Sequence, residues 1–187
     1  MATVKSYFAI AACALALAAF VRTASAERGM SCEGFRVALW RAMDDAGLEI
    51  AHPKLDHPAG GYGPTIRYEL RGIVGLQGQL ICWNGQIFNF SASAQLTGGA
   101  DRIGSSVPQL KSLAAAAICA VSGSRLTPGE CTSQADSLVR LATTEYVNPH
   151  VRGEAQSYGA AGVRLEDGYR IEMEAGEDSV AFFLYGF

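Results

Sequence analysis

Apolar residues between positions 32 and 46 recur at the three- and four-residue spacing of an amphipathic helix. The repeat begins at Phe35 and ends at Ala46, and Ser31 stands where a helix N-cap belongs. Gly47 follows at the position of a left-handed C-terminal cap. We therefore predict a helix over residues 32–46.

Three strands are predicted after a loop at residues 51–64 that is rich in proline and glycine. From Thr65 to Val74, apolar and charged residues alternate with the two-residue period of a half-buried strand. Two further apolar runs, Gln79–Trp83 and Gln86–Ala94, flank Asn84-Gly85, a pair typical of a type I′ hairpin turn. The first half of the chain is thus a helix followed by a three-stranded meander.

Two helices are predicted next. A polar break at residues 98–106 precedes a helical pattern that runs from Val107 to Gly123. The segment Thr127-Pro128-Gly129-Glu130 then has the arrangement of a capping box, with proline at the first helical position. We expect this last helix to end near Val147, because Asn148-Pro149 follows it.

The C-terminal third reads as three more strands. A three-residue loop over Glu166–Gly168, with its glycine in a left-handed conformation, pairs Leu165 with Tyr169 and Val163 with Ile171. A two-residue turn would instead place apolar residues opposite charged ones, so we predict the longer, bulged turn.

The final run, Val180–Phe187, is nearly all apolar, and we expect it to be buried on both faces or to lie centrally in the sheet. The element order α-βββ-αα-βββ predicts an α+β fold in which helices pack on an antiparallel sheet. A helix followed by a meander occurs twice, which suggests duplication, but no residue repeat accompanies it.

The first 26 residues have the three parts of a bacterial-type secretory signal peptide. Lys5 supplies the positive charge, Tyr7–Val21 forms an uncharged core, and Ala24-Ser25-Ala26 fits a cleavage site. We predict cleavage after Ala26, a single mature domain over residues 27–187, and a periplasmic or secreted location without stable membrane insertion.

Two alternatives to cleavage at Ala26 are weaker. A membrane anchor needs about 20 strongly apolar residues, whereas this run is shorter, rich in alanine and followed by Arg22. A lipoprotein processing box ending at Cys13 would have too few apolar residues before it.

The charge of the mature chain argues against a nucleic-acid partner. Removing Lys5 and Arg22 lowers the basic count from 15 to 13 against 18 acidic residues, a net charge of about −5. No basic cluster interrupts this acidic balance.

Four cysteines remain in the mature chain, and in an oxidising compartment they predict two disulfides. Cys119 lies in the last turn of one predicted helix and Cys131 in the first turn of the next, so a short connection brings them together. Cys32 and Cys82 pair by elimination, although the sequence permits three connectivities. A zinc site is disfavoured because no C-x-x-C pair is present.

The three histidines offer only weak candidates for catalysis or metal binding. His52, Asp56 and His57 are close in sequence but fall in a proline loop, where a polar surface role with no metal is the expectation. A Ser–His–acid site built on His150 stays open, because such triads assemble in space.

Two larger groups of residues have both a functional and a structural interpretation. Six acidic residues could supply paired carboxylates or hold Ca²⁺, although a solvated sheet rim is the simpler interpretation. Eight aromatic residues could line an apolar pocket between helices and sheet, although plain core packing is commoner. The acidic set is Glu166, Asp167, Glu172, Glu174, Glu177 and Asp178, and the aromatic set is Trp40, Trp83, Phe88, Phe90, Tyr146, Phe182, Phe183 and Tyr185.

No catalytic or cofactor motif emerges from these patterns, and we expect no bound cofactor. The leading hypothesis is a non-catalytic binding or interaction domain of the cell envelope, whose partner is an envelope protein or a small ligand. The alternatives are a small hydrolase with an active site around His150 or the acidic C-terminal strands, and a complex subunit whose exposed strand edge pairs with a partner.

Overall fold

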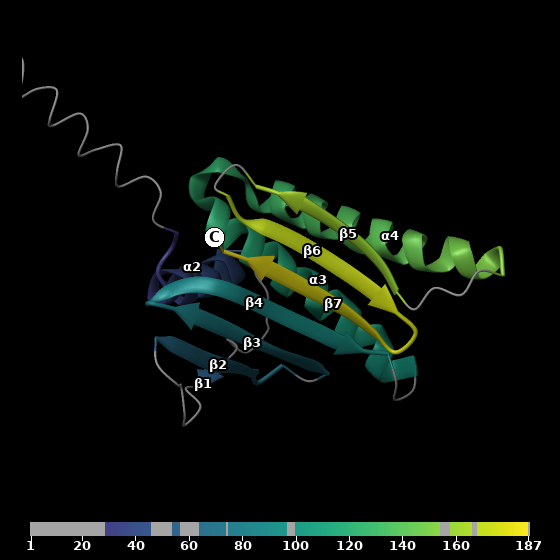
Figure 1. Cartoon of the computed structure of the whole chain (residues 1–187), viewed down its shortest axis with the longest axis horizontal. Coiled ribbons are helices and arrows are strands. Elements are labelled where there is room, and N and C mark those ends of the chain that lie inside the picture. Colours follow the sequence, from purple (N-terminus) through teal and green to yellow (C-terminus); the bar gives the residue numbers. More distant parts are fainter. Residues whose placement is uncertain are drawn as a thin grey trace, which may run out of the picture.

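The structure is a computed structural model that describes residues 29–45, 54–56, 64–73, 75–96, 100–153, 158–165 and 168–186. Within these residues the fold is α+β, with three α-helices and a seven-stranded antiparallel sheet (Figure 1). The order of helices and meanders is the predicted one, apart from a short additional strand. The helices are α2 (Cys32–Asp45), α3 (Ala100–Ser122) and α4 (Pro128–Val151), with a 3₁₀ turn, η1 (Gly123–Arg125), between the last two.

The strands form one sheet in the order β1-β2-β3-β4-β7-β6-β5. This order pairs the C-terminal strand, the last of the second meander, with β4, the last of the first, so the sheet joins both halves of the chain. The strands are β1 (Lys54–Asp56), β2 (Thr65–Arg71), β3 (Leu76–Trp83), β4 (Gln86–Gln95), β5 (Tyr158–Arg164), β6 (Arg170–Gly176) and β7 (Ser179–Tyr185).

Both predicted helix N-termini have the expected side-chain caps. The backbone N–H of Gly34 donates to the Ser31 hydroxyl at 3.0 Å at the start of α2. At the start of α4 the N–H of Thr127 donates to the Glu130 carboxylate at 2.7 Å, and the N–H of Glu130 donates to the Thr127 hydroxyl at 3.3 Å. The capping box is therefore formed in both directions.

The two predicted hairpin turns are also confirmed. Asn84 and Gly85 have φ values of 49° and 77°, the two left-handed positions that a type I′ turn requires. Gly168 has a φ of 85°, and the N–H of Leu165 donates to the carbonyl of Tyr169 at 2.7 Å. This register pairs Val163 with Ile171, as the bulged turn predicts.

Helix α3 begins earlier than predicted, because the polar stretch before Val107 is helical from Ala100 onward. Pro108 consequently lies inside the helix rather than near its start. Ser106 is buried, and its Cβ lies 3.1 Å from the position that a Cβ on Gly75 would occupy. Tertiary packing against the β2–β3 connection therefore overrides the weak helix propensity of glycine and serine.

Helix α4 also extends beyond its predicted end at Val147, to Val151. The N–H of Arg152 donates to the carbonyl of Asn148 at 3.3 Å, so the helical turn continues past Pro149. Proline removes its own N–H donor but leaves the carbonyls of the last turn available to later donors.

The strand limits differ from the prediction at four places. The segment 51–64, predicted as a loop, contains β1, which pairs with β2 at the sheet edge. Strand β2 ends at Arg71 rather than Val74, where Gly72 has a φ of 96°. Strand β3 begins at Leu76, three residues early, and β4 ends at Gln95, one residue late. The hydrophobic pattern identifies strands well but their pairing partners set where they end.

The hydrophobic core lies between the helices and one face of the sheet. The ring centroids of Phe35 and Phe90 are 5.3 Å apart, and those of Phe90 and Phe182 are 6.4 Å apart. All three side chains are fully buried, so they join α2, β4 and β7 in one cluster. Arg36 adds a second connection, because its guanidinium lies over the rings of Trp40 and Tyr68.

Both predicted disulfides are present. Cys32 at the start of α2 is bonded to Cys82 on β3, with 6.1 Å between their Cα atoms. Cys119 on α3 is bonded to Cys131 on α4, with 5.7 Å between theirs. One disulfide therefore fixes a helix to the sheet and the other joins two helices.

Candidate binding groove on the open sheet face

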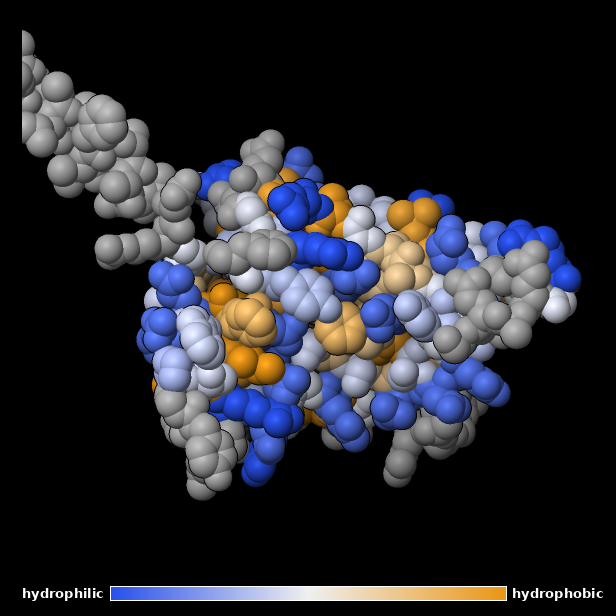
Figure 2. Space-filling view, viewed as in Figure 1, coloured by the Kyte–Doolittle hydropathy of each residue, from blue (hydrophilic) through white to orange (hydrophobic). Residues whose placement is uncertain are grey.

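The face of the sheet that points away from the helices is not covered by any helix or strand that the structure describes. In β7, buried Val180, Phe182 and Leu184 alternate with half-buried neighbours, so this strand is central but buried on one face only. Of the two alternatives predicted for the C-terminal run, the central position in the sheet is the one observed, and burial on both faces is not. Figures 1 and 2 view the molecule from this open side, where hydrophobic and hydrophilic side chains are mixed over the strands.

Strand register arranges the open-face side chains in two adjacent rows. Opposite residues in antiparallel strands point to the same face. The first row is Glu69, Gln79, Ser91, Phe183 and Glu172, and the second is Gln77, Ser93, Ala181 and Glu174. Each row is uncharged over β3, β4 and β7, with acidic residues on β6.

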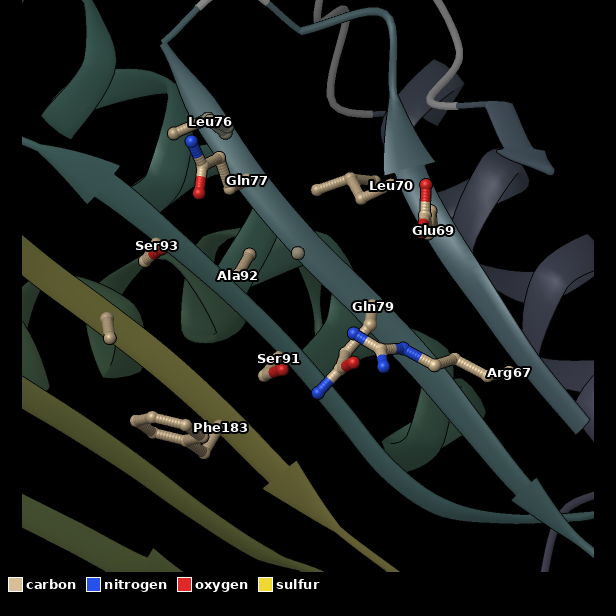
Figure 3. A pocket seen from close by; sticks show the side chains of 12 residues that line it. Arg67, Glu69, Leu70, Leu76, Gln77, Gln79, Ser91, Ala92, Ser93 and Phe183 are labelled. Carbon is tan, nitrogen blue, oxygen red and sulfur yellow. The ribbon is translucent and has the colours of Figure 1, made fainter. Parts of the chain in front are cut away.

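A groove of about 530 Å³ lies over these central strands. The open-face residues that line it include Gln77, Gln79, Ser91, Ser93, Ala181 and Phe183. Figure 3 shows the serines on β4, Phe183 on β7, and the Arg67 side chain extending from β2 over β3 toward Gln79. The groove thus combines amide and hydroxyl groups with one aromatic ring, the mixture found in small-molecule sites.

Gln79 has a buried polar atom that lacks a partner. Its side-chain Oε1 makes no hydrogen bond within the described part of the chain, although solvent does not reach it. A buried acceptor without a donor is costly, so a ligand N–H or O–H that reached it would be stabilised.

The β2 side of the groove carries two cations, of which one forms an ion pair with a described residue. Arg71 donates to the Glu69 carboxylate at 2.9 Å, and this hydrogen bond holds the pKa of Glu69 below its usual range. Arg67 makes neither a hydrogen bond nor an ion pair with any other residue that the structure describes, although its charge adds to the lowering of the Glu69 pKa. Its positive charge therefore faces the groove.

The β6 side shows the opposite charge. Arg170 donates to the Glu172 carboxylate at 3.3 Å, whereas Glu174 has no such partner among the described residues. Burial, and then the charge of Glu172, raise the pKa of Glu174. The same two causes, burial first, raise the pKa of Tyr185, with Glu174 adding to them.

Aromatic residues also border this face. Phe183 and Tyr185 are stacked, with 6.1 Å between ring centroids and 10° between ring planes. Trp83 and Phe88, near the β3–β4 hairpin, are 52% and 57% exposed. Aromatic area left in contact with solvent is commonly used for recognition.

The histidine candidates are not brought together by anything that the structure describes. His52 and His57 lie outside the described residues. Asp56 lies on β1 and His150 in the last turn of α4, but neither side chain is among those described. These candidates stay predictions.

The acidic candidates that the structure describes are divided between strand β6 and the connection that follows it. Glu172 and Glu174 share the open face of β6, whereas Glu177 and Asp178 are exposed in the β6–β7 connection. Glu166 and Asp167 lie outside the described residues. Of the acidic candidates that the structure describes, Glu172 and Glu174 are therefore the two beside the groove, on the strand next to its β7 side.

The aromatic candidates are divided between the two faces of the sheet. Phe90 and Phe182 fill the space between helices and sheet, as core residues do, and the groove lies on the opposite face. Of the predicted aromatic set, Phe183 lines that groove. Trp40 and Tyr146 are half-buried residues of the helices.

Sequence reasoning missed the groove residues on β3 and β4. Gln77, Gln79, Ser91 and Ser93 alternate with buried residues, which is the ordinary pattern of a strand. The signal that could have identified them is the lack of charge among the polar residues of these two strands. A solvated sheet surface usually carries charged side chains, whereas uncharged amides and hydroxyls suit hydrogen bonding to a ligand.

Within the described residues, no group of three or more His, Cys, Asp or Glu side chains is placed to hold a metal ion. In the same part of the chain, none of the helices has the length and apolar character needed to cross a bilayer. Comparisons with known protein families, curated proteins and solved structures found no match. The class that the fold defines is therefore an α+β domain with two disulfides and one open sheet face.

Proposed function

We propose that the chain is an exported, non-catalytic binding protein of the cell envelope, and that the groove on the open sheet face holds its ligand. The observation that carries this proposal is the row of uncharged amide and hydroxyl groups beside Phe183. Such groups orient a ligand by hydrogen bonds while the ring and Ala181 contact its apolar parts.

The compartment is supported independently of the groove. Two disulfides indicate an oxidising environment. Residues 1–26 supply the matching export signal. N-terminal sequencing of the envelope fraction should find Glu27 as the first residue, and an intact Met1 or a lipid-modified Cys13 would contradict export as a soluble protein.

The binding function is tested with the small-molecule fraction of an envelope extract. The purified mature protein is incubated with this fraction and examined by native mass spectrometry. We expect a one-to-one adduct whose mass equals that of a compound in the untreated extract, because binding leaves the ligand unchanged.

A matched pair of variants tests the place of binding. Ala181→Trp puts a large side chain into the groove, and Leu141→Trp puts the same side chain at an exposed position on α4. The adduct should be lost in the first variant and kept in the second. An adduct that survives Ala181→Trp, or no adduct with any extract component, would refute the groove as the binding site.

A hydrolase is the second candidate, favoured by the neighbouring Glu172 and Glu174. A carboxyl group whose pKa is raised beside a second carboxylate is the arrangement of an acid–base pair. In that case the extract would yield products of altered mass, and Glu174→Gln would abolish their formation while the starting compound still bound.

A further inference from the structure

Two charges that make no hydrogen bond or ion pair with any described residue lie on opposite sides of the groove. Arg67 is on β2 and Glu174 on β6, and each stands next to a pair that is already neutralised, Arg71 with Glu69 and Arg170 with Glu172. Among the described residues, a cationic side chain without a hydrogen-bond or ion-pair partner thus lines the groove on β2, and an anionic one stands on β6, the strand next to the groove's β7 side.

The surface between these charges is suited to a peptide backbone. The side-chain amides of Gln77 and Gln79 can each donate and accept a hydrogen bond, and the hydroxyls of Ser91 and Ser93 can do the same. Peptide groups present one donor and one acceptor per residue. The buried, unpartnered Oε1 of Gln79 is an acceptor that a peptide N–H would satisfy.

The dimensions indicate the length of the occupant. Four strand spacings of about 4.8 Å separate β2 from β6, or roughly 19 Å. Arg67 is opposite Arg170, four residues along β6 from Glu174, so the diagonal between the backbones of Arg67 and Glu174 is roughly 23 Å. The Arg67 side chain, which extends toward Gln79, shortens the gap between the two charges. An extended peptide of about four residues spans ~13 Å at ~3.3 Å per residue. Small side chains at Ser93 and Ala181 leave room for it to cross the central strands.

Building on the proposed binding function, we propose that the groove binds short peptides with free ends, whose carboxylate pairs with Arg67 and whose ammonium group pairs with Glu174. Phe183 contacts an apolar side chain of the peptide, and the amides and hydroxyls of β3 and β4 bind its backbone. Both pairs are charge-assisted hydrogen bonds, the stronger kind.

The first experiment varies the charges of the ligand. Calorimetric titration of the mature protein uses the tetrapeptide Ala-Ala-Phe-Ala with free ends, with an acetylated amino end, with an amidated carboxyl end, and with both modifications. We expect each modification to weaken binding about tenfold. Equal affinity for the free and the doubly modified peptide would overturn the proposal.

The second experiment assigns each peptide end to its side chain. Arg67→Gln should weaken binding of the free peptide about tenfold but leave the amidated peptide unaffected, and Glu174→Gln should behave in the same way toward the acetylated peptide. Arg140→Gln and Glu145→Gln on the exposed surface of α4 change the net charge equally and should have no effect. A loss that is the same for all four peptides would overturn the assignment.

The outcome for other ligands separates this inference from the proposed function. If no peptide binds at millimolar concentration, or if a neutral oligosaccharide such as cellotetraose binds more tightly, the peptide inference fails. The binding function then stands or falls separately, on the extract adduct and its loss in Ala181→Trp.

Discussion

Glu174 carries a carboxylate in a place that disfavours its charge. Burial and neighbouring Glu172 raise its pKa in the folded protein, so the protonated form is favoured there more than in the unfolded chain. The stabilising effect of this group is therefore present at low pH and is lost as pH rises through the folded pKa.

Replacing this side chain by its neutral analogue should stabilise the free protein. We expect Glu174→Gln to raise the Tm at pH 7 by roughly 1–3 °C, a modest effect because solvent screens most of the group. The gain should vanish below about pH 4, where the wild-type carboxyl is also neutral. Thermal melts at both pH values check this, with Glu145→Gln as the control, and a lowered Tm at pH 7 would contradict it.

A second residue-scale prediction concerns the contact between α4 and β5. A Cβ on Gly159 would overlap the backbone nitrogen of Tyr146 and the carbonyl oxygen of Ala142, so helix and strand would have to separate. We expect Gly159→Ala to lower the free energy of unfolding by about 1–3 kcal/mol. Gly129→Ala, at a position with open space around it, should leave the free energy unchanged or slightly higher in the same denaturant titration.

At the scale of an element, the capping box fixes where α4 begins. The backbone N–H of Thr127 and then its side chain hydrogen-bond Glu130, and these bonds lower the pKa of that carboxyl group. This stabilisation is present above the ordinary pKa of glutamate and is lost as pH falls through the folded value.

Thr127→Ala should remove about 1 kcal/mol of stability at neutral pH, because one N-terminal N–H loses its acceptor. In the same series, Thr144→Ala changes a threonine whose hydroxyl bonds only the carbonyl of Arg140 within α4. We expect a smaller change from it. Urea unfolding compares the two, and equal losses would show that the cap has no special role.

The two disulfides connect elements at different sequence separations, 50 residues for Cys32–Cys82 and 12 for Cys119–Cys131. In the chain-entropy model the longer loop contributes about 4 kcal/mol and the shorter about 3 kcal/mol. Paired Cys→Ala variants should therefore both lower the free energy of unfolding, the first pair more. The reverse order in denaturant titrations would show that contacts near the cysteines outweigh loop closure.

For the whole molecule, local patterns predicted the elements other than β1, and their order, but not the extent of the helices. Helix caps and tight turns depend on contacts within a few residues, so the sequence alone predicts them. The examples are Ser31, Asn84-Gly85, Thr127 and Gly168. The early start of α3 depends instead on Ser106 packing near Gly75, a contact that only the assembled fold creates.

The candidate site was less predictable than the fold. Phe183 and the pair Glu172 and Glu174 were candidates from the sequence, but their relation to Gln79 depends on β7 entering the sheet between β4 and β6. That placement brings together strands about 90 residues apart in sequence and no local pattern specifies it. The sequence alone did not identify Arg67 either, because its role as a charge facing the groove depends on Glu69 pairing with Arg71 instead.

The adjacent aromatic residues of β7 provide a direct test of this two-faced architecture. Phe182 is fully buried against Phe90 on the helix side, whereas Phe183 lies on the open face and lines the groove. Phe182→Ala should lower the free energy of unfolding by about 3–5 kcal/mol, since it removes a ring from a packed core and leaves a cavity. Phe183→Ala removes the same atoms from a half-exposed position and should cost less than half as much, while weakening binding of any ligand that occupies the groove. Denaturant titration and calorimetry of both variants separate the two roles, and comparable losses of stability would mean that the sheet is covered on both faces.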